Sequence, residues 1–304
     1  MSYVVQVDSS PVYELIVSLY CYIEHPTSKH NAFGKAWKTD VRRRLSDSLS
    51  ERLEDHRLEV LHRLNLLVWQ CPGERTVENF LHWLTNMAPG EIYEKLVPWV
   101  SSFKEDMNSV RDLIVSALHD WHEQYFRHID PAFLRVLKHS GDQVAQLLPS
   151  TPAVELIEQC TNGIRVEPSP GIEKVLLVPQ IHCNPYTVID HYEGLIVCQY
   201  PVGMPATDPT VPSFKLMNTL KALSDENRLR ILQYVAEEPR SFKEIAAYIG
   251  LVKSNVHYHL TALRLSGLLR SHYVKDKIES YSSRMGPLNH LESDIAAYIH
   301  RTHV

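Results

Sequence analysis

The sequence predicts a mainly α fold with small β elements, an α+β protein of two domains. The chain has 304 residues, which is long enough for two hydrophobic cores. Apolar residues recur with helical spacing through most of residues 11–160, whereas residues 174–200 contain three short runs rich in Val, Ile and Tyr. Residues 201–212 contain four prolines and have neither a helical nor a strand period, so they predict a linker.

The first helix is predicted to begin at Pro11, directly after Ser9 and Ser10. Its apolar residues are spaced along one helix face, and they are Val12, Leu15, Ile16, Leu19 and Ile23. Further helical patterns, bounded by Pro, Gly or a capping residue, follow. They cover residues 35–49, 53–69, 77–87, 91–100, 103–126, 131–138, 141–148 and 153–160.

The hydrophobic period then changes to that of strands. Residues 174–182, 186–192 and 195–200 are separated by Asn-Pro and Glu-Gly turn signals. We expect a small antiparallel meander here, and Tyr3–Val7 can supply another strand to it. Residues 1–200 are therefore expected to form a helical domain that ends in a small sheet.

Composition favours a cytoplasmic protein. No apolar stretch reaches the roughly 18 residues of a membrane span, and the first segment lacks a basic start and carries Asp8, unlike a secretory signal. The five cysteines, Cys21, Cys71, Cys160, Cys183 and Cys198, show no C-x-x-C pair and are expected to be mostly buried and reduced.

Catalytic and cofactor motifs are missing from the sequence. The stretch His119–His128, HDWHEQYFRH, lacks the H-E-x-x-H spacing of a zinc site, and His182, Cys183 and His191 are interrupted by Pro185. The sequence contains neither a glycine-rich phosphate loop nor a G-x-S-x-G motif. We therefore expect no enzyme activity, no metal and no cofactor. The five tryptophans are expected in the core, with an apolar ligand pocket as the alternative.

Charge is distributed unevenly along the chain. Residues 213–284 contain 12 Lys and Arg against 7 Asp and Glu, whereas residues 1–212 contain 18 against 27. The net charge of the whole chain is −5, but the positive charge is concentrated after the linker. This asymmetry is expected when one domain approaches phosphate and the other does not.

Three helical patterns follow the linker. The apolar face of the first consists of Phe214, Leu216, Met217, Leu220 and Leu223. Ser224 can cap the second helix, which ends before Pro239 and whose inward residues are Leu229, Ile231, Leu232 and Val235. Ser241 and Glu244 form a capping box that begins a short third helix, and Gly250 ends it.

A fourth helix begins within three residues of Gly250, with Val256, Leu260 and Leu263 on its apolar stripe. A short helix, a tight turn and a second helix with a polar leading face form the helix-turn-helix pattern, whose second helix enters the major groove of DNA. Gly267 ends that helix. Residues 268–274 and 278–282 are then expected to form a hairpin, the wing, with Lys275–Lys277 at its tip.

These residues resemble the ArsR-type winged helix-turn-helix regulators of bacteria over about 75 residues. The segments that carry the resemblance are LKALSDENRLRILQYV, SFKEIAAYIG, KSNVHYHLTALRLSGLL and the wing. The most specific positions are Asp225, Arg228, Ile231 and Leu232, then Ser254, Val256, His259, Leu260, Leu263, Gly267 and Leu268. The N-terminal 200 residues resemble only the long accessory domain of some uncharacterised members.

The resemblance implies a homodimeric transcription regulator that binds double-stranded DNA. The apolar stripe for the dimer helix after the wing consists of Leu288, Leu291, Ile295, Tyr298 and Ile299. Two departures from the family stand out. SFKEIAAYIG lacks the cysteine pair of the metal-sensing members, so metal sensing is not expected. Val252 replaces the usual Ser or Thr cap, which predicts a helix start nearer Ser254.

We expect residues 213–304 to form the DNA-binding domain with its dimerisation helix, and residues 1–200 to bind a small-molecule effector or extend the dimer. The expected DNA-binding residues are Ser241, Lys253, Ser254, Asn255, His257, Tyr258, Thr261, Arg264, Lys275 and Lys277. For the charged ones, and for His257 and Tyr258, the alternative is plain solvent exposure, and His259 is expected to be packed. The alternative function is a winged-helix protein-interaction or scaffold protein without specific DNA binding.

Overall fold

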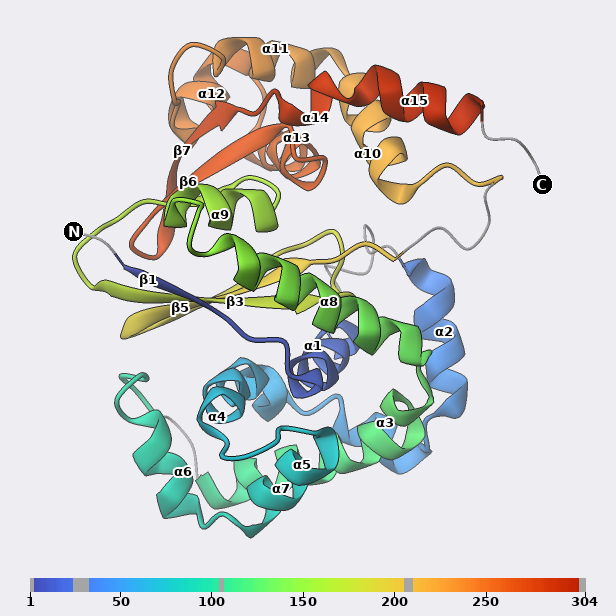
Figure 1. Cartoon of the computed structure of the whole chain (residues 1–304), viewed down its shortest axis with the longest axis vertical. Coiled ribbons are helices and arrows are strands. Elements are labelled where there is room, and N and C mark those ends of the chain that lie inside the picture. The colour runs from blue at the N-terminus through green and yellow to red at the C-terminus, as the bar shows by residue number, and fades with distance from the viewer. Residues whose placement is uncertain (1–2, 24–32, 104–106, 205–209, 301–304) are drawn as a thin grey trace. The chain divides into compact units, whose positions relative to one another are not determined.

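The computed structural model describes residues 3–23, 33–103, 107–204 and 210–300. It divides into two compact units, and most of their helices and strands are labelled in Figure 1. The N-terminal unit comprises Tyr3–Leu147 and Gly171–Met204, and the C-terminal unit comprises Leu148–Pro170 and Pro205–Val304. From Tyr3 onward, the chain therefore passes from one unit to the other three times.

Most of the N-terminal unit is helical. Its α-helices are α1 (Pro11–Ile23), α2 (Gly34–Arg44), α3 (Asp47–Arg52), α4 (Leu64–Gln70), α5 (Val77–Asn86), α6 (Pro89–Leu96), α7 (Met107–Gln124) and α8 (Pro131–Leu147), with 3₁₀ segments η2 (His56–Arg63) and η3 (Phe126–His128). The helix expected over residues 35–49 is broken in two, because Ser46 caps a new helix by accepting the N–H of Leu49 at 3.2 Å.

Two short helices expected on either side of Gly141 are one continuous helix, α8. Gly141 is buried inside it, and a Cβ at this position would lie 2.7 Å from the Cβ of Ser9. The glycine therefore serves the close approach of α8 to Ser9, and it does not end the helix.

The sheet of this unit is mixed, so the expected antiparallel meander is wrong. Its strands β1 (Val4–Val7), β3 (Ile172–Gln180), β4 (Val188–Tyr192) and β5 (Gly194–Pro201) are ordered β1-β3-β5-β4. β1 and β5 both pair parallel with β3, and β4 pairs antiparallel with β5. The unbroken apolar runs of β3 and β5 are typical of parallel strands that are buried on both faces. Neither run shows the alternation of apolar and polar residues that would indicate an antiparallel strand with one face in solvent.

Helices cover both faces of this sheet. Leu176, Val178, Leu195 and Val197 belong to the main hydrophobic core with α1, α4, α5 and α7. On the opposite face, the hydroxyl groups of Tyr200 and of Ser140 on α8 lie 3.1 Å apart. Trp121 is fully buried in this core. The other four tryptophans are partly buried and pack against the core, as expected.

A buried polar network links α1 to the turn after β3. The carboxylate of Glu14 accepts the backbone N–H of His182 at 3.0 Å, and its Oε1 lies against His182 Nδ1. The Tyr125 hydroxyl lies 2.6 Å from His182 Nε2 and accepts the indole N–H of Trp37 at 2.8 Å. Because each of these buried groups is partnered, the network stabilises the unit without leaving a charge unpaired.

Asp190 on β4 gives the stability of this unit a pH dependence. Burial raises the pKa of its carboxyl group to about 7, although hydrogen bonds from Asn65 and Gln199 oppose the rise. Between about pH 4 and pH 7, Asp190 keeps its proton in the folded state, whereas the same carboxyl group in the unfolded chain has released it. Because of this difference, the free energy of unfolding is highest below about pH 4 as far as Asp190 is concerned. It falls by at most about 1.4 kcal/mol per pH unit as the pH rises from about 4 to 7.

We expect Asp190→Asn to remove this fall, because the amide stays neutral. Urea unfolding at pH 5 and pH 8 should show a larger loss of stability for the native chain than for the variant. Asp142→Asn, an exposed position on α8, is the matched control and should behave like the native chain. An identical pH dependence in the native chain and Asp190→Asn would contradict the assignment.

The C-terminal unit contains a helical bundle and a three-stranded sheet. Its elements are α9 (Ala153–Cys160), β2 (Ile164–Val166), α10 (Phe214–Leu223), α11 (Glu226–Tyr234), α12 (Phe242–Ile249), α13 (Lys253–Leu265), β6 (Leu269–Val274), β7 (Lys277–Ser283), α14 (Gly286–Asn289) and α15 (Leu291–Ile299). The sheet order is β2-β6-β7. Residues 205–209 of the expected linker lie outside the described residues, and Pro201 belongs to the end of β5.

Residues 148–170, which we name the arm, were expected in the N-terminal domain but belong to the C-terminal unit. The reason is backbone pairing: β2 of the arm pairs parallel with β6, with Ile164 opposite Ser271 and Val166 opposite Tyr273. The N–H of Glu167 extends this ladder to the carbonyl of Tyr273 at 2.8 Å. Pairing of strands far apart in sequence decides the unit to which the arm belongs.

Two details of α11 differ from expectation. Its N-cap is Asp225, whose Oδ1 accepts the N–H of Arg228 at 3.0 Å, and Ser224 instead follows the end of α10. Leu229, expected to face inward, is 48% exposed, while Ile231 and Val235 are buried. Leu229 precedes Ile231 by two residues, about 200° around a helix, so the two cannot share one face.

Candidate nucleic-acid interface

The helix-turn-helix consists of α12, the turn Gly250–Val252 and α13. The capping box at the start of α12 is present, since Ser241 N donates to Glu244 Oε2 at 2.8 Å and Glu244 N donates to Ser241 Oγ at 3.4 Å. Gly250 has a left-handed φ of 72°, which lets the chain reverse directly after α12. Both signals had been predicted from the sequence and both are confirmed.

The apolar stripe of α13 fixes how this helix is presented. Val256, Leu260 and Leu263 are at most 2% exposed and pack in one core with residues of α11, α12 and β6. Because these three residues occupy one side of the helix, the polar residues between them must lie on the other side. The orientation of α13 is thereby set by its own sequence spacing.

A polar cluster adds to this packing. Asp225 Oδ1 lies 3.5 Å from Nδ1 of His259, which is 7% exposed and therefore packed as expected. Arg228 donates to the carbonyl of Lys221 on α10 at 3.0 Å. Burial works to raise the pKa of Asp225, but the N–H of Arg228 and the charges of Arg228 and His259 hold that pKa below its usual range. The cluster joins α10, α11 and α13 at residues on which the family resemblance depends.

The leading face of α13 is open to solvent. Lys253, Ser254, Asn255, His257 and Tyr258 are all exposed, Tyr258 by 55%, whereas Thr261 and Arg264 farther along are half-buried. The helix begins at Lys253, one residue before the expected start, and its N-cap Val252 provides no side-chain hydrogen bond. First-turn N–H groups that no side chain caps are suited to contact a phosphate.

Two of the expected DNA-binding side chains also have structural roles. The hydroxyl of Ser241 takes part in the capping box and donates to Glu244 Oε2 at 2.7 Å. The imidazole of His257 stacks on Phe242 of α12, with ring centroids 4.2 Å apart. DNA contact by Ser241 and His257 stays a prediction. Either side chain can contact DNA while it keeps its present partner or after it has given that partner up.

The wing is a hairpin of β6 and β7 with Lys275 and Asp276 at its tip, close to the expected position. Val274 pairs with Lys277, so the connection has two residues, and both lysines are exposed. Lys275 has a left-handed φ of 59°, a conformation that Lys rarely adopts. Lys275 in the connection and Lys277 at the start of β7 therefore present two exposed cationic side chains close to the tip.

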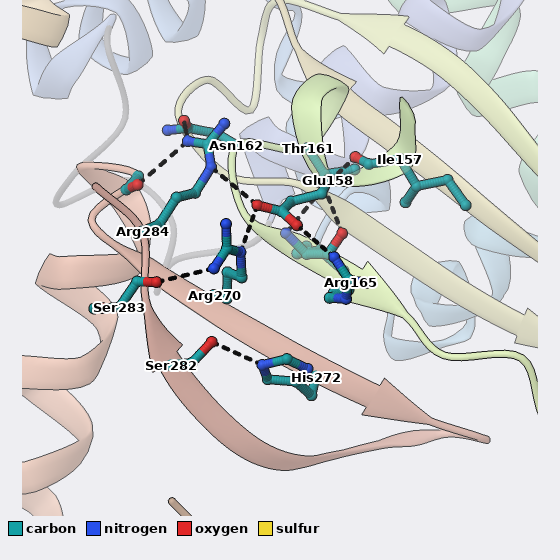
Figure 2. A network of polar contacts seen from close by, with 12 residues as sticks. Ile157, Glu158, Thr161, Asn162, Arg165, Arg270, His272, Ser282, Ser283 and Arg284 are labelled. Carbon is teal, nitrogen blue, oxygen red and sulfur yellow. Dashed lines mark hydrogen bonds and ion pairs between the residues drawn. The ribbon is translucent and has the colours of Figure 1, made fainter. Parts of the chain in front are cut away.

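The arm is bound to the base of the wing by an ion-pair cluster around Glu158 (Figure 2). Oε1 of Glu158 lies 2.6 Å from Nε of Arg270 and 3.4 Å from Nε of Arg284, and Oε2 lies 3.1 Å from Nη1 of Arg165. Burial works to raise the pKa of Glu158, but these three guanidinium groups outweigh it and hold the pKa below its usual range. A single carboxylate thus joins α9, β2, β6 and the end of the wing.

The sequence interpretation missed two features of this unit. The first is β2, whose signal was the short run Ile-Arg-Val between Asn162-Gly163 and Pro168. The second is Lys243, which lies between the capping-box residues Ser241 and Glu244 and was not among the expected DNA-binding residues. It is exposed on the first turn of α12, the helix that crosses the DNA backbone in helix-turn-helix complexes. Lys243 therefore joins the candidate DNA-binding residues.

The candidate metal ligands in the described part of the chain are the His, Cys, Asp and Glu side chains of residues 3–23, 33–103, 107–204 and 210–300. No group of three or more His, Cys, Asp or Glu side chains there could hold a metal ion. In the same ranges, no helix is long and apolar enough to cross a bilayer. The described cysteines are free thiols, and Cys160 alone among the five is not buried.

Comparison with known proteins agrees with this geometry. Residues 225–271 match the family model for bacterial regulatory proteins of the arsR family. The matched residues run from the N-cap of α11 to β6 and therefore contain the complete helix-turn-helix. No curated protein and no solved structure matches the chain.

Proposed function

We propose that this chain, whose residues 225–271 form an ArsR-type helix-turn-helix domain, regulates transcription by binding operator DNA as a homodimer that does not sense metal. The observation that carries the proposal is the two-sided character of α13. Its apolar stripe is buried while Lys253, Ser254, Asn255 and Tyr258 are exposed. Such side chains can donate to or accept from base edges and phosphates in the major groove.

The wing supports the same proposal. Lys275 and Lys277 at its tip can contact the phosphate backbone or the minor groove beside the site of α13. Phosphate contacts position the protein, and base contacts from the leading face of α13 specify the sequence. The two elements together offer both kinds of contact.

The dimer is supported by α15. None of its residues is buried, and Leu291, Ile295 and Ile299, the last of them 66% exposed, line a shallow groove with Leu288. An apolar stripe that the chain's own described residues cover only in part is suited to pack against a second copy. A two-fold pair of α13 helices would then read two half-sites one turn of DNA apart.

The arm supports a role for the N-terminal unit. The chain enters the arm from α8 and leaves it for β3, so both ends of the arm continue into the N-terminal unit while β2 is paired with the wing. A change of state in the N-terminal unit can therefore act on the wing through the backbone. Coupling of this kind requires two states that differ in operator affinity.

The proposal is tested by titrating the full chain against DNA from upstream of its own gene, with fluorescence anisotropy as the measurement. We expect binding that tightens steeply as salt is lowered and that survives an excess of unrelated DNA, by a protein that light scattering shows to be dimeric. A folded, dimeric sample that binds no DNA at low salt would refute the proposal. That result would favour a winged helix used for protein interaction.

A further inference from the structure

We infer that the N-terminal unit binds a small apolar molecule with one anionic head group, in a pocket between η2, α4, α6 and α7. Binding itself does not depend on the proposed function. The regulatory consequence, a change of operator affinity, rests on it. The inference depends on the size of the pocket, its apolar floor and the two arginines at its rim.

The pocket is a cavity of about 240 Å³. Its floor is formed by side chains at most 6% exposed, and they are Leu64, Leu67, Leu84, Ile92, Leu96 and Ile114. An apolar cavity of about 150 Å³ already accepts benzene. The present pocket is partly open to solvent, and its volume and apolar floor are sufficient for a small apolar ligand.

Phe103 provides an aromatic wall. Its ring lies 4.8 Å from that of Tyr93 on α6, centroid to centroid, and the guanidinium of Arg63 lies over it at 5.6 Å. None of the five tryptophans is among the lining residues, so the pocket is not the tryptophan-lined one considered from the sequence. The wall instead combines an aromatic face with a cation held above it.

The rim determines the head group. Among the residues that the structure describes, no carboxylate forms an ion pair with Arg63 within 4.0 Å. Arg111 is held by Asp112 at 2.6 Å and by the carbonyl of Met87 at 3.2 Å, and its buried Nε has no hydrogen-bond partner in the described part of the chain. Among the described lining residues, Arg63 is the cation without an ion-pair partner and Glu59 is the acidic one, while Arg111 is already paired with Asp112, so Arg63 is the group at the rim that can bind a carboxylate.

The test is calorimetric titration of the full chain with decanoate below its micellar concentration, in parallel with decanol. We expect saturable binding of one decanoate per chain and at least tenfold weaker binding of the neutral alcohol. Arg63→Gln should weaken decanoate binding at least tenfold, because a hydrogen-bonded ion pair is lost. Arg135→Gln, an exposed arginine on α8 outside the lining, should bind like the native chain.

Val110→Phe fills the pocket from α7 and should abolish binding, with circular dichroism to verify the fold. Arg63 is a rim residue, so its variant keeps the test decisive if the filled variant fails to fold. Absence of saturable binding, equal binding of acid and alcohol, or unchanged binding by Arg63→Gln would each overturn the inference.

Operator affinity measured with and without decanoate then tests the consequence. We expect a change of at least fivefold in the native chain and none in Arg63→Gln. Decanoate binding without any change in DNA affinity would overturn the regulatory part. Failure of the DNA titration in the absence of any ligand would instead count against the proposed function, so the two failures can be told apart.

Discussion

Replacing the three exposed lysines of the leading face and the wing tip in both protomers is expected to weaken DNA binding by more than about 1,000-fold at about 0.1 M salt. The variant is Lys253→Gln, Lys275→Asn and Lys277→Gln. Each phosphate contact contributes about 0.9 to the slope of log K against log salt, and the dimer loses three such contacts per protomer, so the slope should fall by roughly five. Asn is chosen at position 275 because it tolerates the left-handed φ of 59° found there.

The control is Lys215→Gln with Lys221→Gln, which removes two exposed lysines of α10, a helix outside the helix-turn-helix. Per charge removed, the control should change the slope far less. The measurement is anisotropy titration of one operator fragment at four salt concentrations. Equal slopes for the triple variant and the native chain would show that these lysines contact solvent, which was the alternative for each of them.

Glu158→Gln is expected to destabilise the C-terminal unit by about 2–4 kcal/mol, because it leaves Arg165, Arg270 and Arg284 without their shared carboxylate. Glu158 is 7% exposed, so solvent replaces little of the lost interaction. Since the pKa of Glu158 is lowered by folding, its contribution is present above about pH 4.5 and is lost as the pH falls further. The variant and the native chain should therefore converge at acid pH.

Thermal unfolding at pH 7 measures the loss, and Glu155→Gln, an exposed position on the same helix, is the control. Hydrogen exchange gives a second readout, because release of the arm would expose the N–H of Ser271, which donates to Gly163 O at 2.8 Å. We expect faster exchange at Ser271 in Glu158→Gln alone. Unchanged stability and exchange would show that strand pairing by itself holds the arm.

The helix-turn-helix could be predicted closely because its signals are local. Ser241 and Glu244 lie three residues apart, Gly250 and Gly267 each end a helix with a φ near 72°, and Val256 and Leu260 repeat at helical spacing. In each case the physical cause lies within one or two turns of chain. The sequence therefore contained the information in a form that needs no knowledge of the fold.

The sheet of the N-terminal unit and the position of the arm could not be predicted in the same way. The runs Leu176–Val178 and Ile196–Cys198 are apolar at every residue, so no alternation indicates which strand pairs with which or in which direction. β2 has three residues, and no sequence pattern near it indicates that its partner is β6, which lies more than 100 residues later. Direction and partner of such strands depend on where the rest of the chain has packed.

By itself, the amino-acid sequence determined that α13 buries one stripe and offers a polar tip, and that positive charge accompanies it, since spacing and capping act over a few residues. Tertiary structure alone decided that residues 148–170 pair with the wing and that Glu158 forms ion pairs with three arginines. It also decided that a pocket lies next to Arg63. Each of these depends on side chains brought together from distant segments, and chain folding settles such contacts through packing and loop closure that no local pattern records.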